Sequence, residues 1–150
     1  MASLKARWHR SIREIPEQQW EQLLGPDVIP FYRWNWLAAL EDSGSVAPDQ
    51  GWQPLHLSLW RGEDDLCAVA PLYLKGHSYG EVVFDRAFAR LARDLGLRYY
   101  PKLIGMSPVS PVQGYRFHVA AAEDPAALTQ LMLEMIDAFA RNNGILSCNF

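Results

Sequence analysis

Two apolar segments on either side of an acidic turn constrain the fold of this chain more than any other feature. In residues 53–60, Leu55, Leu57 and Leu59 alternate with more polar neighbours, which is the period of a half-buried strand. Residues 61–65 read Arg-Gly-Glu-Asp-Asp and reverse the chain, and an apolar run follows over 66–74. We therefore expect an antiparallel β-hairpin with a five-residue loop.

Helical spacing of apolar residues recurs in several other segments, and prolines or glycines stand at their ends. The longest such segment begins at Asp124-Pro125 and ends at Gly144, with one apolar and one polar face. The expected helices cover about residues 15–25, 31–42, 85–96 and 124–144, and the other expected strands cover 4–9, 81–84, 99–106 and 145–150.

This order of elements predicts an α+β (mixed α/β) fold, with a central, mostly antiparallel sheet flanked by helices. A hairpin followed by a late strand–helix–strand crossover argues against a doubly wound sheet. The order resembles the first two-thirds of the GNAT N-acetyltransferase fold, so that the sheet is expected to be incomplete at the C-terminus. No repeat or low-complexity linker interrupts the sequence, and we expect a single domain over residues 1–150.

Composition excludes several classes of function. A formal net charge of −3 argues against a dedicated DNA-binding protein, which would carry a basic excess. Two cysteines cannot form a disulfide scaffold, and the four histidines show no metal-ligand spacing, so no metal is expected. The longest apolar run is far shorter than a membrane span, and no secretory signal is evident at the N-terminus. We therefore expect a cytoplasmic location.

One short motif suggests a serine hydrolase. Residues 76–80 read Gly-His-Ser-Tyr-Gly, which satisfies the nucleophile turn Gly-x-Ser-x-Gly, and Asp85 or Asp94 with His118 would complete a triad in the right order. However, this turn should lead directly into a helix, whereas residues 81–84 favour a strand. The alternative interpretation is a tight glycine turn without a catalytic role.

Polar and aromatic residues gather at the ends of two expected strands. The first group is Lys75, His77, Ser78, Tyr79 and Glu81, and the second is Tyr99, Tyr100 and Lys102. If the two strands are neighbours, titratable groups and hydroxyls converge at one end of the sheet, where they can bind an acceptor or position a base. The alternative is a solvated strand edge with tyrosines that cap the core.

Arginines recur along the helix that follows. Arg86, Arg90 and Arg93 are spaced four and three residues apart and share one helix face. They form either a basic surface for an anionic ligand or an ordinary solvated helix face.

Several segments taken together resemble one known family. They are residues 30–46, which begin Pro-Phe-Tyr-Arg-Trp-Asn-Trp, Ala-Pro-Leu-Tyr-Leu-Lys-Gly-His-Ser-Tyr-Gly-Glu at 70–81, Val-Phe-Asp at 83–85, Tyr-Tyr-Pro-Lys-Leu at 99–103 and Ser-Pro-Val at 110–112. They are similar to the bacterial peptidoglycan biosynthesis/recognition family, a GNAT-like group related to the Fem-type aminoacyltransferases. Members of that family continue into a second acyltransferase-like half, so that this chain corresponds to their N-terminal half.

The resemblance implies an acyl- or aminoacyl-transferase that acts on an amine acceptor, a small molecule or a peptide, in cell-wall precursor metabolism. It suggests Glu81 or His77 as the base, and it suggests that the acceptor is bound by Lys75, Ser78, Tyr79, Tyr99, Tyr100 and Lys102. Acyl-CoA or aminoacyl-tRNA is the donor implied for the full-length family. No cofactor site is evident in this chain, because residues 112–116 lack the spaced glycines that cradle a pyrophosphate.

Two alternatives stay open at this stage. The chain can be a non-catalytic recognition module, or a truncated half that needs a partner domain, with an exposed edge at residues 145–150 that favours a homo-oligomer. It can also be a small serine hydrolase that uses Ser78.

Overall fold

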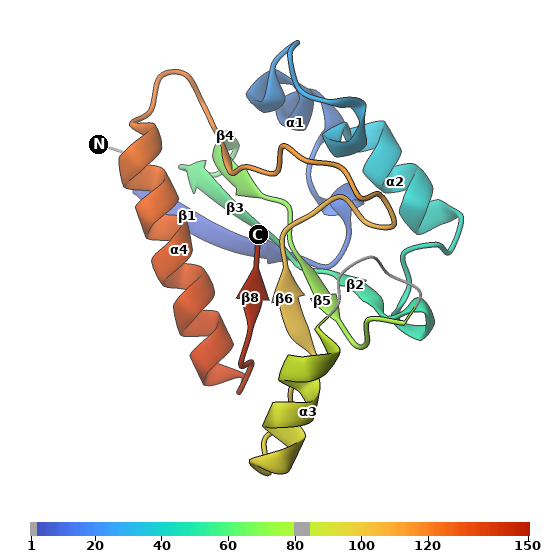
Figure 1. Ribbon diagram of the computed structural model, residues 1–150. Coiled ribbons are helices and arrows are strands. Elements are labelled where there is room, and N and C mark those ends of the chain that lie inside the picture. Colours follow the sequence, from blue (N-terminus) through green and yellow to red (C-terminus); the bar gives the residue numbers. More distant parts are fainter. Residues whose placement is uncertain (1–2, 80–84) are drawn as a thin grey trace.

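The computed structural model of the protein describes residues 3–79 and 85–150, whose strands form two four-stranded sheets (Figure 1). The first sheet has the order β1 (Leu4–His9), β3 (His56–Arg61), β4 (Asp65–Ala70) and β7 (His118–Val119). The second has the order β2 (Trp52–Pro54), β5 (Tyr73–Lys75), β6 (Lys102–Ile104) and β8 (Cys148–Asn149). The helices are α1 (Glu17–Leu24), α2 (Trp34–Asp42), α3 (Arg86–Asp94) and α4 (Pro125–Asn142), with 3-10 turns at Ile12–Glu14, Pro30–Tyr32 and Pro48–Gln50. The predicted α+β class is confirmed.

The predicted hairpin is present as β3 and β4, but it continues into the second sheet. Pro54 and Pro71 lack the N–H group that a continuous ladder needs, so the pairing is interrupted near them. Leu55 N donates to Leu72 O across the interruption, at 2.9 Å. Beyond this bond β2 pairs with β5, and the same two chain segments therefore belong to both sheets. This division was not predicted from the sequence.

Helices cover both faces of the first sheet (Figure 1). On one face α1 and α2 contribute Trp20 and Leu37 to a core that includes Trp60 of β3. On the other face, the α4 residues Leu128, Met132 and Ile136 pack on leucines of β3 and β6. Because both faces are covered, five of the six residues of β3 are buried, and the half-buried strand predicted from the alternating leucines is wrong for this segment.

The late crossover is also confirmed. Strands β6 and β8 are parallel, α4 lies between them in sequence, and every other pairing is antiparallel among the residues the structure describes. The Asp124 side chain accepts hydrogen bonds from the amides of Ala126 and Ala127, which caps the first turn of α4. Strand β8 lies at an edge of the second sheet, and self-association through it stays a prediction.

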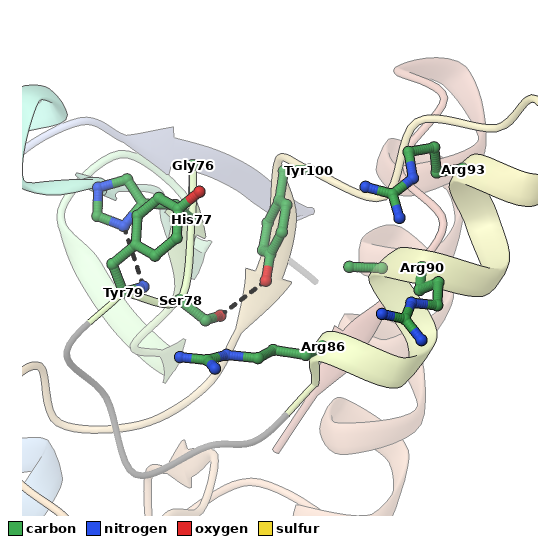
Figure 2. A pocket seen from close by; sticks show the side chains of 9 residues that line it. Gly76, His77, Ser78, Tyr79, Arg86, Arg90, Arg93 and Tyr100 are labelled. Carbon is green, nitrogen blue, oxygen red and sulfur yellow. Dashed lines mark hydrogen bonds between the residues drawn. The ribbon is translucent and has the colours of Figure 1, made fainter.

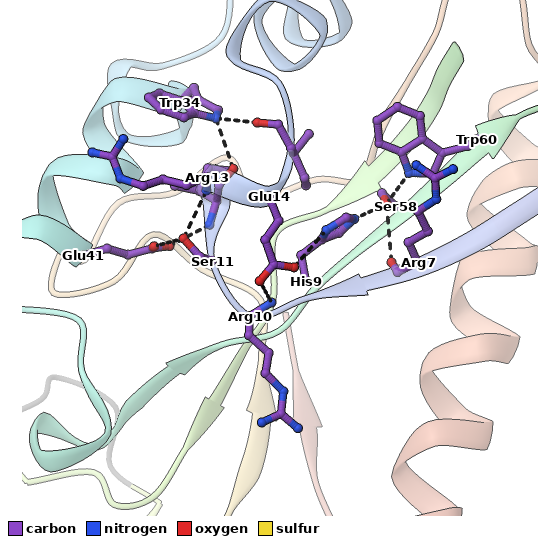
Figure 3. A network of polar contacts seen from close by, with 12 residues as sticks. Arg7, His9, Arg10, Ser11, Arg13, Glu14, Trp34, Glu41, Ser58 and Trp60 are labelled. Atoms are coloured by element: carbon purple, nitrogen blue, oxygen red, sulfur yellow. Dashed lines mark hydrogen bonds and ion pairs between the residues drawn. The ribbon is translucent and has the colours of Figure 1, made fainter. Parts of the chain in front are cut away.

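Polar contacts join β1 to the hairpin and α2 to the 3-10 turn at Ile12–Glu14 (Figure 3). The Ser58 hydroxyl lies 2.6 Å from His9 Nε2 and accepts from Trp60 Nε1 at 2.7 Å. The Glu41 carboxylate of α2 accepts from the amide of Ile12 at 2.9 Å. These bonds satisfy polar groups that packing of the two layers would otherwise leave unpaired.

Four predicted elements differ from the structure, and one of them, the strand expected over 145–150, is confined to β8. The helix expected from residue 31 begins at Trp34, because Pro30–Tyr32 form a 3-10 turn and Arg33 is extended. The strand expected over 99–106 is confined to β6. The strand expected over 81–84 lies outside the described residues.

Buried histidines make the stability of this fold sensitive to acid. His56 Nδ1 accepts from the amide of Leu72 at 3.2 Å, while Nε2 is buried without a partner among the described residues. Burial lowers the pKa of His56 to about 3. An unfolded histidine binds a proton below about pH 6.5, so acidification favours unfolding.

We expect His56 to contribute a loss of about 2 kcal/mol in unfolding free energy between pH 7 and pH 5. The variant His56→Asn keeps an acceptor near Leu72 N but removes the titration. Denaturant unfolding at both pH values should give a smaller acid-induced loss for this variant than for the parent protein. An equal loss in the two proteins would contradict the assignment.

Candidate functional site

The structure brings the two predicted polar strand ends together. Strands β5 and β6 are antiparallel neighbours, and Lys75 is the cross-strand partner of Lys102. Residues 76–79 follow β5 and Tyr100 precedes β6, so both groups lie at one end of the second sheet. The condition for convergence, that the two strands are neighbours, is therefore met for the described residues of both groups.

Asp85, at the start of α3, is the centre of the hydrogen bonds at this sheet end. Its carboxylate accepts from Lys102 Nζ at 2.5 Å, from the Tyr100 hydroxyl at 2.9 Å and from the Ser78 hydroxyl at 3.1 Å. Tyr100 also lies 3.0 Å from Ser78 Oγ, the bond drawn in Figure 2. Asp85 and Lys102 are both buried, and the pair therefore depends on these partners for compensation.

The environment fixes the protonation states of two of these groups. Desolvation alone would raise the pKa of Asp85, but the hydrogen bonds from Lys102, Tyr100 and Ser78 outweigh it and lower that pKa. Burial raises the pKa of Tyr100. At neutral pH the site thus holds an aspartate anion and a protonated phenol, which is able to donate a hydrogen bond.

A pocket of about 570 Å³ opens above this network. Its walls come from the loop after β5, from Tyr100 and from one face of α3 (Figure 2). The residues that line it are Gly76, His77, Ser78, Tyr79, Arg86, Ala89, Arg90, Arg93 and Tyr100. Arg86, Arg90 and Arg93 form no ion pair with any described residue, so three guanidinium groups line one concave space without an anionic partner from residues 3–79 or 85–150. Of the two readings of these arginines, the geometry favours a basic surface.

His77 is held by the loop around it. Its Nδ1 atom accepts from the amide of Tyr79 at 3.3 Å, and its ring packs against the Tyr79 ring at 5.0 Å between centroids. A Cβ at Gly51 would lie 2.6 Å from His77 Nε2. Gly51 also has a φ of 76°, which favours glycine. The residue at position 51 is therefore restricted to glycine both by its backbone conformation and by the nearby His77 ring. His77 Nδ1 is therefore engaged by its own loop, and the imidazole ring lies close to Gly51.

Other predicted site residues do not line this pocket. Lys75 is fully buried, with Nζ 3.9 Å from the centre of the Trp52 ring. Lys102 lies beneath the pocket, in the pair with Asp85. Tyr99 lines a neighbouring cavity of about 330 Å³. Glu81 lies outside the described residues, and its role as a base stays a prediction.

The hydrolase arrangement is not assembled in the described part of the chain. Ser78 donates to Asp85 directly and has Tyr100 as its other partner. His118, the histidine that would complete a triad, is buried on β7 in the other sheet. The triad expected from this motif uses a histidine as the base of its serine, so the geometry gives no support to this function.

Sequence reasoning missed the central position of Asp85. It considered this residue only as the acid of a hydrolase triad. No local sequence pattern indicates that a carboxylate accepts hydrogen bonds from residues 7, 15 and 17 positions away.

Residues 3–79 and 85–150 hold no group of three His, Cys, Asp or Glu side chains that could bind a metal ion. Within the same ranges, no helix has both the length and the apolar character needed to cross a bilayer.

Fold and site together define a mixed α+β protein with a basic, hydroxyl-lined pocket at one sheet end. Residues 11–150 match the model of the FemAB-like family, described as peptidoglycan biosynthesis/recognition. The chain belongs to this family, as the resemblance of its motifs indicated, and its role is therefore related to peptidoglycan. No curated protein and no solved structure matches it.

We expect removal of either partner of the buried pair to destabilise the protein. Lys102→Met leaves the Asp85 carboxylate without its cation and should lower the unfolding free energy by about 3 kcal/mol. Asp85→Asn should have an effect of similar size at pH 7, and this difference should shrink as pH falls through the folded-state pKa of Asp85. The sign follows because a lowered pKa stabilises the fold only while the carboxylate is ionised.

The control is Asp137→Asn, which breaks the exposed pair of Asp137 with Arg141 on α4. Denaturant unfolding should show a change within about 0.5 kcal/mol for that variant. An equally small effect for both aspartates would show that the buried pair does not stabilise this sheet end.

Proposed function

We propose that the protein is an acyl- or aminoacyl-transferase that acts on an amine of a peptidoglycan precursor. The observation that carries the proposal is the pocket in which three arginines face the hydroxyls of Ser78 and Tyr100. Family membership supports the peptidoglycan part of this function.

In the proposed reaction, the nitrogen of the acceptor amine attacks the carbonyl carbon of an activated acyl ester or thioester. A C–N bond forms, the C–O or C–S bond of the donor breaks, and the amine proton leaves to a base while the departing oxygen or sulfur takes up a proton. Negative charge develops on the carbonyl oxygen between these steps. The Tyr100 phenol is protonated and donates to Asp85, so its O–H would turn from that carboxylate to donate a hydrogen bond to the carbonyl oxygen, with Ser78 beside it.

Asp85 and Lys102 have a positioning role in this proposal. They lie below the pocket wall and form an ion pair with each other. The Asp85 carboxylate also accepts the hydrogen bonds that hold Tyr100 and Ser78 in place. Because the oxygens of Tyr100 and Ser78 are held in place, only the turn of an O–H group away from Asp85 is needed as charge develops.

The arginine face of α3 would bind the acidic groups of the acceptor. Carboxylates and phosphates match the planar fork of a guanidinium group, and the three arginines present such forks to one space. Binding the acceptor through these groups, remote from the amine, would orient the amine for attack.

Glu81 and His77 are the proposed bases, and acyl-CoA or aminoacyl-tRNA is the proposed donor. For His77 to accept a proton through Nδ1, its hydrogen bond from the Tyr79 amide must first be released. This engagement of His77 favours a second candidate function, a recognition module that binds peptidoglycan fragments in the same pocket without transfer.

A transfer assay distinguishes the two functions. The protein is incubated with acyl-CoA, or with charged tRNA, and an acidic stem peptide that bears a free side-chain amine, and the peptide mass is followed. We expect the mass of the acyl group to be added. Tyr100→Phe should lower kcat/KM by about 100-fold, as loss of one oxyanion donor does.

Ser78→Ala should also lower kcat/KM, by at least about tenfold, for the same reason. Ser45→Ala, at an exposed serine in the turn after α2, is the control and should leave the rate unchanged. Binding of the peptide without transfer from either donor would identify a recognition module. Neither binding nor transfer by the folded protein would overturn both functions.

A further inference from the structure

Helix α3 carries an apolar face that no other part of the described protein covers. Phe88, Leu91 and Leu95 are 65%, 56% and 66% exposed, and Leu97 just after the helix is 50% exposed. Ala92 is the buried residue of this helix. A helix of nine residues gains little stability from its own hydrogen bonds in water, so a covering surface would stabilise it.

The opposite face of α3 is cationic. With 3.6 residues per turn, Arg86, Arg90 and Arg93 lie on the side of the helix away from Phe88, Leu91 and Leu95, in agreement with the arginine-lined pocket. Residues 86–98 contain four arginines and one aspartate, a net charge of +3 in a chain whose total is −3. The helix therefore concentrates positive charge beside an exposed apolar stripe.

We propose that α3 docks this protein on the surface of an anionic lipid bilayer. The apolar stripe would enter the boundary between headgroups and acyl chains, and the net positive charge of residues 86–98 would attract the anionic lipid surface as a whole. The proposal does not rest on the transfer reaction, since vesicle binding and peptide acylation are measured separately.

The pattern of α3 favours a bilayer over a protein partner. The helix is strongly amphipathic but low in overall hydropathy, which is typical of helices that lie in a membrane interface. The centre of a protein–protein interface is usually depleted of charged residues. In α3, by contrast, a cationic face and an apolar face lie on the same short helix. Figure 1 shows α3 extending away from both sheets, so its free end can reach a flat surface before the rest of the molecule does.

Sedimentation with lipid vesicles tests this proposal. The protein is mixed with vesicles of phosphatidylglycerol and phosphatidylcholine, and separately with vesicles of phosphatidylcholine alone. We expect binding to the anionic vesicles that weakens as salt is added. Leu91→Gln combined with Leu95→Gln should lower the partition coefficient by at least about tenfold, since two apolar side chains are replaced by polar ones of good helix propensity.

The matched control is Leu133→Gln combined with Leu146→Gln, which changes two exposed leucines outside α3. It should bind vesicles as the parent protein does, and both double variants should keep the parent's circular dichroism and cooperative unfolding. Absence of vesicle binding by the parent protein would overturn the proposal, as would equal binding by the two double variants. A dimer that only the α3 variant dissociates, without any vesicle binding, would identify a second copy as the occupant instead.

Discussion

The buried contact between Lys102 and Asp85 is the interaction on which the proposed site depends. It joins the first residue of β6 to the residue that precedes α3, and the same carboxylate also holds Ser78 and Tyr100. A buried charge without its partner is strongly destabilising, so the loop after β5, the residues before β6 and the start of α3 are fixed relative to one another. The hydroxyls and the arginines of the pocket come from these three segments.

The remainder of the fold provides a rigid support for this sheet end. Packing of α1 and α2 on one face of the first sheet and of α4 on the other produces a core in which β3 is almost entirely buried. Helix α3 lies outside this core, since Ala92 is its buried residue. One of its faces is cationic, and the opposite, apolar face is exposed. The parts of the chain proposed to meet ligands or lipid are thus those that contribute least to the core, as is usual for functional segments on a stable scaffold.

Local patterns in the sequence predicted the elements and their neighbours well, but not the long-range polar contacts. Alternating leucines identified β3, and Asp124 identified the start of α4. The polar strand ends indicated a site only if the two strands are neighbours, and the pairing of Lys75 with Lys102 meets that condition. The central role of Asp85 could not be predicted, since its partners depend on tertiary structure. Periodicity in α3 likewise revealed an apolar face but not that this face is exposed, because a pattern defines a face and not what covers it.

The central claim is that the arginine face of α3 makes the pocket an anion-binding site for a peptidoglycan precursor. Calorimetric titration of the protein with an acidic stem peptide tests this most directly. We predict binding that weakens with added salt, and a dissociation constant about tenfold higher for Arg90→Gln, which removes one charge-assisted contact. Arg141→Gln, at an exposed arginine of α4, should leave the constant unchanged. Equal dissociation constants for the two variants, or no binding by the folded protein, would contradict the account.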